Sequence, residues 1–300
     1  MKELLGGYVN GNTIVRIYSD GTRVMETEDD EFAFQFPNSM DCKITNQCDQ
    51  RCHWCHENST PDGRHGDILN EAFIDTLRPH TEMAIGGGNV LSHPQLMPFL
   101  KKLKSKQVIA NITVNQTHFM CDRDFLMGLT RWELIRGLGV SLQKPSDEFI
   151  RLIKGFDHAV VHVINGVVTM QDMERLMNQG LKLLILGYKQ FRRGADWYGM
   201  YDRMIEPNKA RLKEALPEIM AGFKVVSFDN LAVEQLAVKD VLSEKQWETF
   251  YNGSDGKQSG TMYVDMVERK FALSSTSNIR YDLTDSIEDM FRTVCSVSTY

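Results

Sequence analysis

The sequence is poor in cysteine, carries more acidic than basic side chains, and has no long hydrophobic run. Its 300 residues include six cysteines, and 34 Lys and Arg stand against 40 Asp and Glu, which gives a net charge of −6. Six cysteines are too few for a disulfide scaffold in a chain of this length. The acidic balance excludes a non-specific nucleic-acid binder, which needs a basic face.

Membrane and export signals are also missing from the sequence. No apolar stretch approaches the roughly 20 residues that cross a bilayer. The first seven residues, MKELLGG, become polar too early for a signal peptide. We therefore expect a cytoplasmic protein that has neither a membrane nor a nucleic acid as its partner.

Short apolar runs alternate with amphipathic stretches through the middle of the chain. We predict strands at about 40–45, 82–85, 108–114, 138–142, 159–164, 181–186 and 224–229. We predict helices at 67–78, 94–106, 121–135, 145–154, 169–179 and 207–221. Alternation of this kind indicates βαβ units and a parallel sheet, whose ligand site lies at the carboxyl ends of the strands.

The two ends of the chain depart from this alternation. An Asp-Gly pair at 20–21 separates the apolar runs 13–18 and 23–26, and this predicts a β hairpin. The tail predicts two added strands and a terminal helix, at 261–266, 271–275 and 283–294.

The predicted fold class is a parallel (β/α) barrel, either partial or nearly complete and of the TIM type. A small N-terminal β hairpin and a C-terminal extension flank it. We divide the chain into an N-terminal β element (1–38), a barrel core (39–230) and a C-terminal extension that caps the barrel (231–300). Both ends are expected to cover the side of the barrel that holds the site.

Three cysteines form a cluster directly after the first predicted barrel strand. Cys48, Cys52 and Cys55 have the spacing C-x₃-C-x₂-C, and three thiolates within eight residues can converge on one soft metal centre. Three ligands leave one iron of a four-iron cluster without a protein ligand, and an open position is typical of a reactive site. A closed Cys₃His zinc site completed by His53 or His56 is the alternative.

The cluster spacing resembles the motif of the radical SAM superfamily, and Trp54 stands where that family carries an aromatic residue before the last cysteine. The resemblance implies a [4Fe–4S] cluster on Cys48, Cys52 and Cys55, and S-adenosylmethionine (SAM) bound to the open iron. It implies reductive cleavage of SAM to methionine and a 5′-deoxyadenosyl radical, which abstracts hydrogen from a substrate. It also implies a (β/α) barrel fold and a reductant such as flavodoxin or ferredoxin.

Further segments resemble the family at the ends of later strands. The run Gly86-Gly87-Gly88-Asn89 is similar to its GGE motif, with Asn89 in the acidic position. Asn115 stands in a segment similar to its Thr-Asn-Gly motif. The resemblance implies cofactor contacts at Trp54, Gly86, Gly87, Gly88, Asn89, Asn115, Ser141, Asn165, Gly187 and Tyr188. A plain strand-to-helix turn explains the glycines equally well, and a turn-forming residue explains Asn115.

Basic residues after the later strands indicate an anionic substrate. We predict substrate contacts at Lys144, Lys189 and Arg192, because ammonium and guanidinium groups bind carboxylate and phosphate. Solvated surface side chains are the alternative. The substrate is expected to be a small molecule or a peptide. Asp229, at the end of the seventh strand, either binds a substrate hydroxyl or amine or caps the following helix.

The remaining cysteines indicate no second cluster. Cys42, Cys121 and Cys295 are scattered, so a cysteine-rich extension holding auxiliary clusters is not expected. A different class of function also fits the cysteine loop, namely a non-catalytic regulatory protein that binds zinc or an iron–sulfur cluster without turnover.

Overall fold

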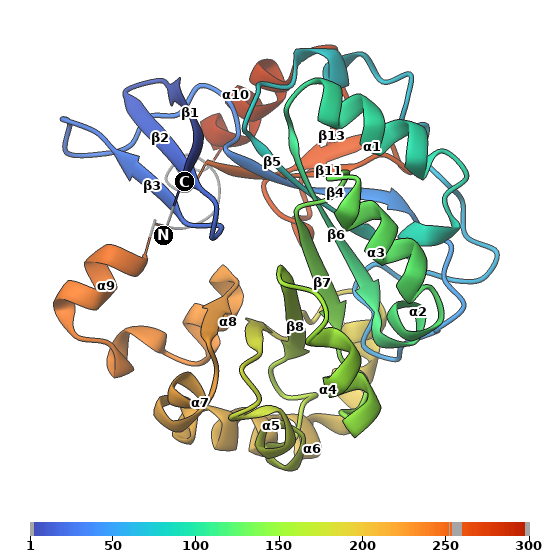
Figure 1. The fold of residues 1–300 in the computed structure, drawn as a ribbon, viewed down its shortest axis with the longest axis vertical. Coiled ribbons are helices and arrows are strands. Elements are labelled where there is room, and N and C mark those ends of the chain that lie inside the picture. Colours follow the sequence, from blue (N-terminus) through green and yellow to red (C-terminus); the bar gives the residue numbers. More distant parts are fainter. Residues whose placement is uncertain (1–2, 252, 254–259, 298–300) are drawn as a thin grey trace.

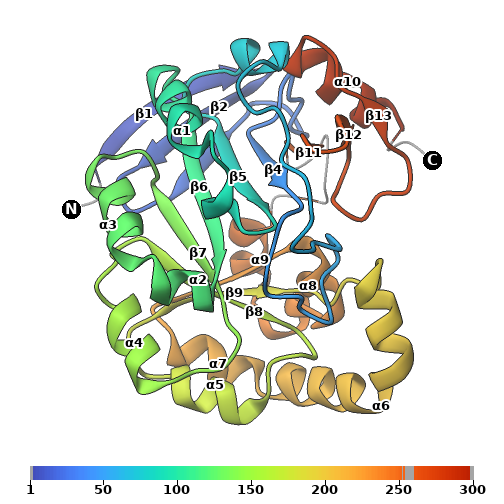
Figure 2. The same cartoon turned by 90° about the vertical axis from the view of Figure 1, so that its right-hand side faces the viewer.

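A curved sheet of ten strands organises the molecule (Figures 1 and 2). The computed structural model describes residues 3–251, 253 and 260–297. Seven successive strands run parallel: β4 (Ser39–Thr45), β5 (Glu82–Gly87), β6 (Ile109–Asn115), β7 (Gly137–Ser141), β8 (Ala159–Ile164), β9 (Lys182–Leu186) and β10 (Val225–Phe228). They confirm the strand predictions to within two residues at each end.

The C-terminal part of the chain continues this sheet beyond β4. Strand β11 (Thr261–Asp265) pairs with β4 in parallel, and β12 (Lys270–Ala272) and β13 (Tyr281–Asp282) follow in antiparallel pairing. The strand order is β10-β9-β8-β7-β6-β5-β4-β11-β12-β13. Since β10 and β13 stand at its two ends, the described strands form an open, partial barrel, as predicted.

Side-chain alternation gives the barrel its two faces. In β8 the residues Ala159, Val161 and Val163 are buried, whereas His162 and Ile164 are half-buried. Successive side chains point to opposite faces of a strand. The buried set packs against the outer helices, and the half-buried set faces the interior of the barrel.

Helices cover the outer face of the parallel part of the sheet (Figure 2). They are α1 (Leu96–Ser105), α2 (Gln116–Cys121), α3 (Arg123–Arg131), α4 (Asp147–Ile153), α5 (Met170–Leu176), α6 (Arg193–Glu214) and α7 (Leu216–Gly222). Side-chain caps fix several of the starts. The Ser146 hydroxyl accepts the Phe149 N–H at α4, and Thr169 and Asp172 form a capping box at α5.

Three of the helix predictions were wrong in extent. The segment 67–78 forms only a short 3₁₀ turn, η1 (Ala72–Thr76), because the Asp67 carboxylate instead accepts the N–H groups of residues 69 and 70. The segment 121–135 divides into the end of α2 and a separate α3 that stops at Arg131.

The third helix prediction that was wrong in its extent is the one for residues 207–221. Helix α6 begins fourteen residues earlier, at Arg193, and continues through Pro207, while α7 starts separately at Leu216. Non-helical angles at Tyr201 (φ −130°, ψ 21°) divide α6 into two parts. Proline in the first turn of a helix was expected, whereas Pro207 lies in the second part of α6.

The N-terminal strands form a separate antiparallel sheet in the order β1-β2-β3. Strands β2 (Thr13–Tyr18) and β3 (Arg23–Glu26) are the predicted hairpin, and β1 (Leu4–Asn10) is an addition to it. Arg23 Nη2 lies 2.9 Å from Glu82, which begins β5, and Arg136 donates to the carbonyls of Tyr18 and Ser19 just before β7 begins. This sheet therefore packs at the amino ends of the barrel strands, and the expectation that it covers the carboxyl side was wrong.

The C-terminal extension contains further short helices. They are α8 (Asn230–Gln235), η3 (Val238–Val241), α9 (Glu244–Phe250) and α10 (Ile287–Val297). In the barrel core, a 3₁₀ turn η2 (Val90–Ser92) lies between β5 and α1. The terminal helix begins four residues later than predicted. Within the described residues, no helix has both the length and the apolar character needed to cross a bilayer.

Candidate active site at the carboxyl ends of the strands

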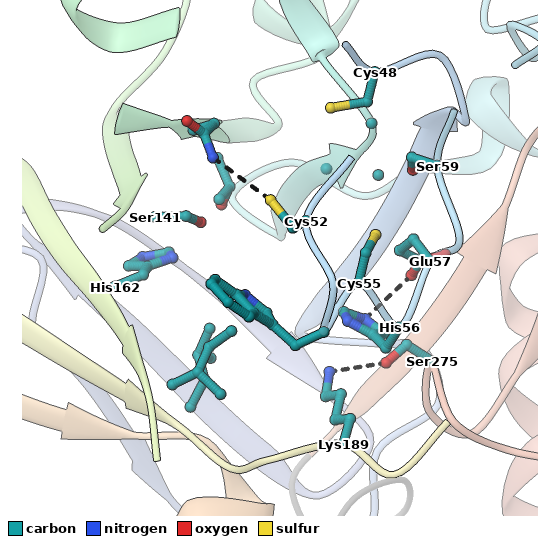
Figure 3. Close-up of a pocket in the computed structure, with 18 of the residues that line it drawn as sticks. Cys48, Cys52, Cys55, His56, Glu57, Ser59, Ser141, His162, Lys189 and Ser275 are labelled. Carbon is teal, nitrogen blue, oxygen red and sulfur yellow. Dashed lines mark hydrogen bonds and ion pairs between the residues drawn. The ribbon is translucent and has the colours of Figure 1, made fainter. Parts of the chain in front are cut away.

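A cavity of about 370 Å³ opens among the carboxyl ends of the parallel strands (Figure 3). Its wall includes the loop after β4 (residues 46–60, called the cysteine loop), the ends of β5 to β9, and residues of the C-terminal extension. The parallel arrangement brings these segments together because all the carboxyl ends meet at one edge.

Backbone hydrogen bonds hold the cysteine loop in place. The Cys48 N–H donates to the Thr60 carbonyl at 2.8 Å, and the Cys55 N–H donates to the Cys52 carbonyl at 3.2 Å. The Asn89 N–H donates to the Gln47 carbonyl at 2.6 Å, which attaches the loop to the end of β5. These hydrogen bonds fix the backbone of the loop at both ends and attach it to β5.

Gly88 is needed for this attachment. A Cβ at Gly88 would lie 2.1 Å from the Gln47 carbonyl oxygen, so a larger residue would push the cysteine loop away from β5. A Cβ at Gly86, in contrast, meets no atom within 4 Å. Gly86 therefore leaves open space at the cavity wall, where a ligand can approach the backbone.

The three clustered cysteines all line this cavity as free thiols. Figure 3 shows them on the same side of it. Burial, together with the charges of Cys55 and Cys48, raises the pKa of Cys52 to about 11, and burial also raises the pKa of Cys48. Three half-buried soft ligands facing one cavity fit an iron–sulfur cluster with one open iron, which would hold them deprotonated.

Neither nearby histidine joins the cysteines as a fourth ligand. The His53 ring stacks on Trp197 with centroids 4.7 Å apart and an interplanar angle of 16°. His56 Nε2 lies 3.4 Å from a Glu57 carboxylate oxygen. Within residues 3–251, 253 and 260–297, no three His, Cys, Asp or Glu side chains gather around a single ion position. In this structure both imidazole rings therefore contact residues other than the three cysteines.

Most of the predicted cofactor contacts lie on the cavity wall. They are Trp54, Gly86, Gly87, Gly88, Asn115, Ser141, Gly187 and Tyr188. Asn115 both begins a helix and faces the site. Its Oδ1 accepts the Thr117 N–H at 2.9 Å and so caps α2, and its Nδ2 lies 4.0 Å from Cys52 Sγ. The turn-forming role and the cavity position therefore coexist in one side chain.

Four predicted contacts lie outside the cavity wall, namely Asn89, Asn165, Lys144 and Arg192. The Asn89 side chain accepts the Leu91 N–H at 3.1 Å and so caps η2. Asn165 is fully buried and donates to Gln235 Oε1 at 3.1 Å. Lys144 is exposed, and its backbone pairs with the Gln116 side chain. Each has a structural role that the strand-end position alone did not reveal.

The basic residues after β9 divide into two groups. Arg192 donates to the Glu57 carbonyl at 3.0 Å and Arg193 donates to the Ser59 carbonyl at 2.5 Å, so both hold the cysteine loop. Lys189 lines the cavity, as Arg193 does, but its Nζ donates to Ser275 Oγ at 2.9 Å and not to the cysteine loop (Figure 3). The predicted substrate contact at Arg192 thus lies behind the loop rather than on the wall.

A buried polar network that the sequence did not indicate joins the cysteine loop to β11. Lys43 Nζ lies 3.1 Å from Glu57 Oε2 and 3.1 Å from Asp265 Oδ2, and the Tyr263 hydroxyl donates to Glu57 at 3.1 Å. Burial alone would raise the pKa of Glu57, but His56 and Lys43 hold it well below its usual range. Burial and the Glu57 charge raise the pKa of Tyr263. The available signal was a lysine inside the apolar strand MDCKIT.

His162 contributes a neutral imidazole to the cavity from β8. A Cβ at Gly139, on the adjacent strand, would lie 2.2 Å from its ring, so that glycine makes the room it occupies. Burial lowers the pKa of His162 to about 4. The ring is therefore uncharged near neutral pH and can donate one hydrogen bond and accept another.

Asp229 is a helix cap. Its Oδ1 accepts the Ala232 N–H at 2.8 Å, which begins α8, and the Gly187 N–H at 2.8 Å. The capping alternative is confirmed, and the same carboxylate also positions Gly187 on the cavity wall.

Comparisons with known proteins identify the fold. A scan of the sequence against protein-family models finds no match, and neither does a search of curated proteins. Among solved structures, SuiB of Streptococcus suis bound to the precursor peptide SuiA is similar with a TM-score of 0.58, at 11% identity, over 89% of this chain and 68% of SuiB. A structure of SuiB bound to S-adenosylmethionine gives 0.55, also at 11% identity, over 88% and 69%.

These two likenesses span most of the present chain. They confirm the partial-barrel fold class. At 11% identity they establish the fold, and the activity has to be argued from the site itself.

Proposed function

We propose that this protein is a radical SAM enzyme. The observation that carries the proposal is the position of Cys48, Cys52 and Cys55 on one cavity wall, after the first barrel strand and beside the glycine-rich end of β5. SuiB, which has a similar fold, has been captured with SAM bound, and this supports SAM as the second cofactor. When bound, the cluster supplies the electron that cleaves SAM to methionine and a 5′-deoxyadenosyl radical.

The chain's own residues bind and orient the cofactor in this proposal. The bare backbone at Gly86 receives the polar end of SAM, since a Cβ there would meet no atom within 4 Å and no side chain intervenes. Asn115, Ser141 and the neutral His162 offer uncharged hydrogen-bonding groups along the same wall. Placing these groups on strand ends keeps them rigid, which a radical reaction needs in order to select one hydrogen atom.

The substrate we propose is a peptide that enters the same cavity. SuiB has been captured with its precursor peptide, which supports a peptide over a small molecule. We also propose that the protein acts in the cytoplasm and that a flavodoxin or ferredoxin supplies the electron. The C-terminal extension belongs to the site in this account, because Tyr263 and Ser275 line the cavity.

Metal content after anaerobic purification tests the cluster assignment. We expect about four iron and four sulfide per chain, and loss of both in Cys52→Ala. Cys121→Ala is the matched control, because Cys121 is an exposed cysteine on α2 outside the cavity wall. One zinc per chain, with iron absent, would instead support the regulatory metal-binding protein. Full iron content in Cys52→Ala would refute the ligand assignment.

A further inference from the structure

Lys189 lies at a junction between the two sides of the open barrel. It follows β9, which is second from one end of the strand order, and its partner Ser275 follows β12, which is second from the other end. Their 2.9 Å hydrogen bond therefore spans the open side of the sheet above the cavity. Both side chains also line that cavity.

The Lys189 ammonium has no carboxylate partner among the described residues. Its hydrogen bond goes to the neutral hydroxyl of Ser275, a residue that is only 8% exposed. Arg280 fixes the loop that carries Ser275, because it donates to the Ser275 carbonyl at 2.6 Å and to the Ser277 carbonyl at 3.2 Å. Among the described residues, a cation and a hydroxyl are thus held side by side with no carboxylate in contact with either.

The surroundings add to this positive charge. The charged side chains that meet in this corner are Lys43, Lys189, Arg192, Arg193, Arg280, Asp41, Glu57 and Asp265. Five are cations and three are carboxylates, and two of the carboxylates, Glu57 and Asp265, already contact Lys43. The corner therefore has an excess of positive charge inside a partly closed cavity, where electrostatic attraction is stronger than in open solvent.

We propose that Lys189 and Ser275 form a binding subsite for a carboxylate of the substrate, and that this carboxylate is an Asp or Glu side chain of a peptide. An ammonium and a hydroxyl can both donate to one carboxylate, and the charged donor makes that hydrogen bond strong. The existing Lys189–Ser275 contact already fixes both side chains, so less rotamer entropy is lost on binding. The subsite deepens the proposed function by naming its substrate class.

A pair of matched peptides tests the subsite by binding rather than by turnover. The probes are acetyl-Ala-Glu-Ala-amide and acetyl-Ala-Gln-Ala-amide, titrated into the cluster-loaded protein with SAM and followed by saturation-transfer NMR. We expect the Glu peptide to bind the wild-type protein about tenfold more tightly. We expect Lys189→Met to abolish that preference and Ser275→Ala to reduce it.

Lys154→Met is the matched control, because Lys154 also has one neutral partner, Gln179, but lies outside the cavity wall. It should keep the full preference. Equal binding of the two peptides by the wild-type protein would overturn the proposal, whether or not the variants fold. An unchanged preference in Lys189→Met would overturn it as well.

SAM also carries a carboxylate, so SAM affinity is measured in the same variants. Unchanged affinity in Lys189→Met is expected, and a tenfold loss would overturn the substrate assignment by placing the cofactor carboxylate at this subsite. Failure of the proposed function can be distinguished from failure of the subsite proposal, since only the former would show as missing iron and missing SAM binding in the wild-type protein.

Discussion

Replacing Lys43 by Met should destabilise the protein strongly, although Lys43 is one of many charged residues. Its side chain is 1% exposed, and its two partners, Glu57 and Asp265, are 9% and 0% exposed. Removing one partner of a buried ion pair costs about 3–5 kcal/mol, because the opposite charge stays buried without compensation. Methionine fills a similar volume, so the packing of β4 changes little.

The remaining contacts set the magnitude within that range. Glu57 keeps the Tyr263 hydroxyl, and Asp265 keeps the N–H groups of Val267 and Glu268 at 3.1 and 3.0 Å. These donors offset part of the loss, so we expect a decrease of about 3 kcal/mol in the free energy of unfolding. Because Glu57 belongs to the cysteine loop, we also expect reduced iron loading.

Urea denaturation of the metal-free protein measures this cost. The matched control is Lys270→Met, whose ion pair with Asp282 has exposures of 37% and 87%. Exposed pairs contribute about 0–1 kcal/mol, so the control should unfold nearly as the wild type does. If Lys43→Met came within about 1 kcal/mol of the control, the buried network would not hold the cysteine loop to β11 as described.

Three further predictions concern the cavity wall and the segments that support it. Gly88→Ala should lower the free energy of unfolding by about 1–3 kcal/mol through overpacking. Gly86→Ala should leave the free energy of unfolding unchanged and weaken SAM binding, measured by calorimetry. Equal effects of the two variants on stability would contradict the geometry described for the two glycines. Wild-type stability should fall as pH drops from about 6.5 toward about 4. In this range the histidine of the unfolded chain takes up a proton, whereas His162 in the folded protein stays neutral because burial lowers its pKa to about 4. In urea titrations across that range His162→Gln should lack this component, and an identical pH profile would refute it. Asp229→Ala should cost about 1 kcal/mol by uncapping α8, and an unchanged denaturation midpoint would refute the capping role.

The barrel strands could be predicted from sequence because each is a short apolar run with a turn at its end. Helix boundaries were harder to predict from the sequence, since they depend on caps and tertiary contacts. The segment 67–78 has helical composition, yet the local Asp67 turn competes with helix formation. Helix α6 continues through Pro207, where sequence rules favour a helix start.

A site residue could be predicted from the sequence only where a pattern within one short segment points to its role. The cysteine spacing lies within eight residues, so the sequence alone could predict a candidate soft-metal site. The Lys43 network needs Asp265, more than 200 residues away, to lie on an adjacent strand, and no local pattern reveals that pairing. Arg192 shows the converse case, because its position after β9 was predicted but its direction, toward the Glu57 carbonyl, was not.

Formation of 5′-deoxyadenosine tests the central claim most directly. The reconstituted protein is reduced anaerobically with dithionite in the presence of SAM, and the products are separated by chromatography. We predict 5′-deoxyadenosine in the wild-type protein and in Cys121→Ala, and none in Cys52→Ala. A four-iron protein that binds SAM but yields no 5′-deoxyadenosine, even with peptide present, would contradict the account.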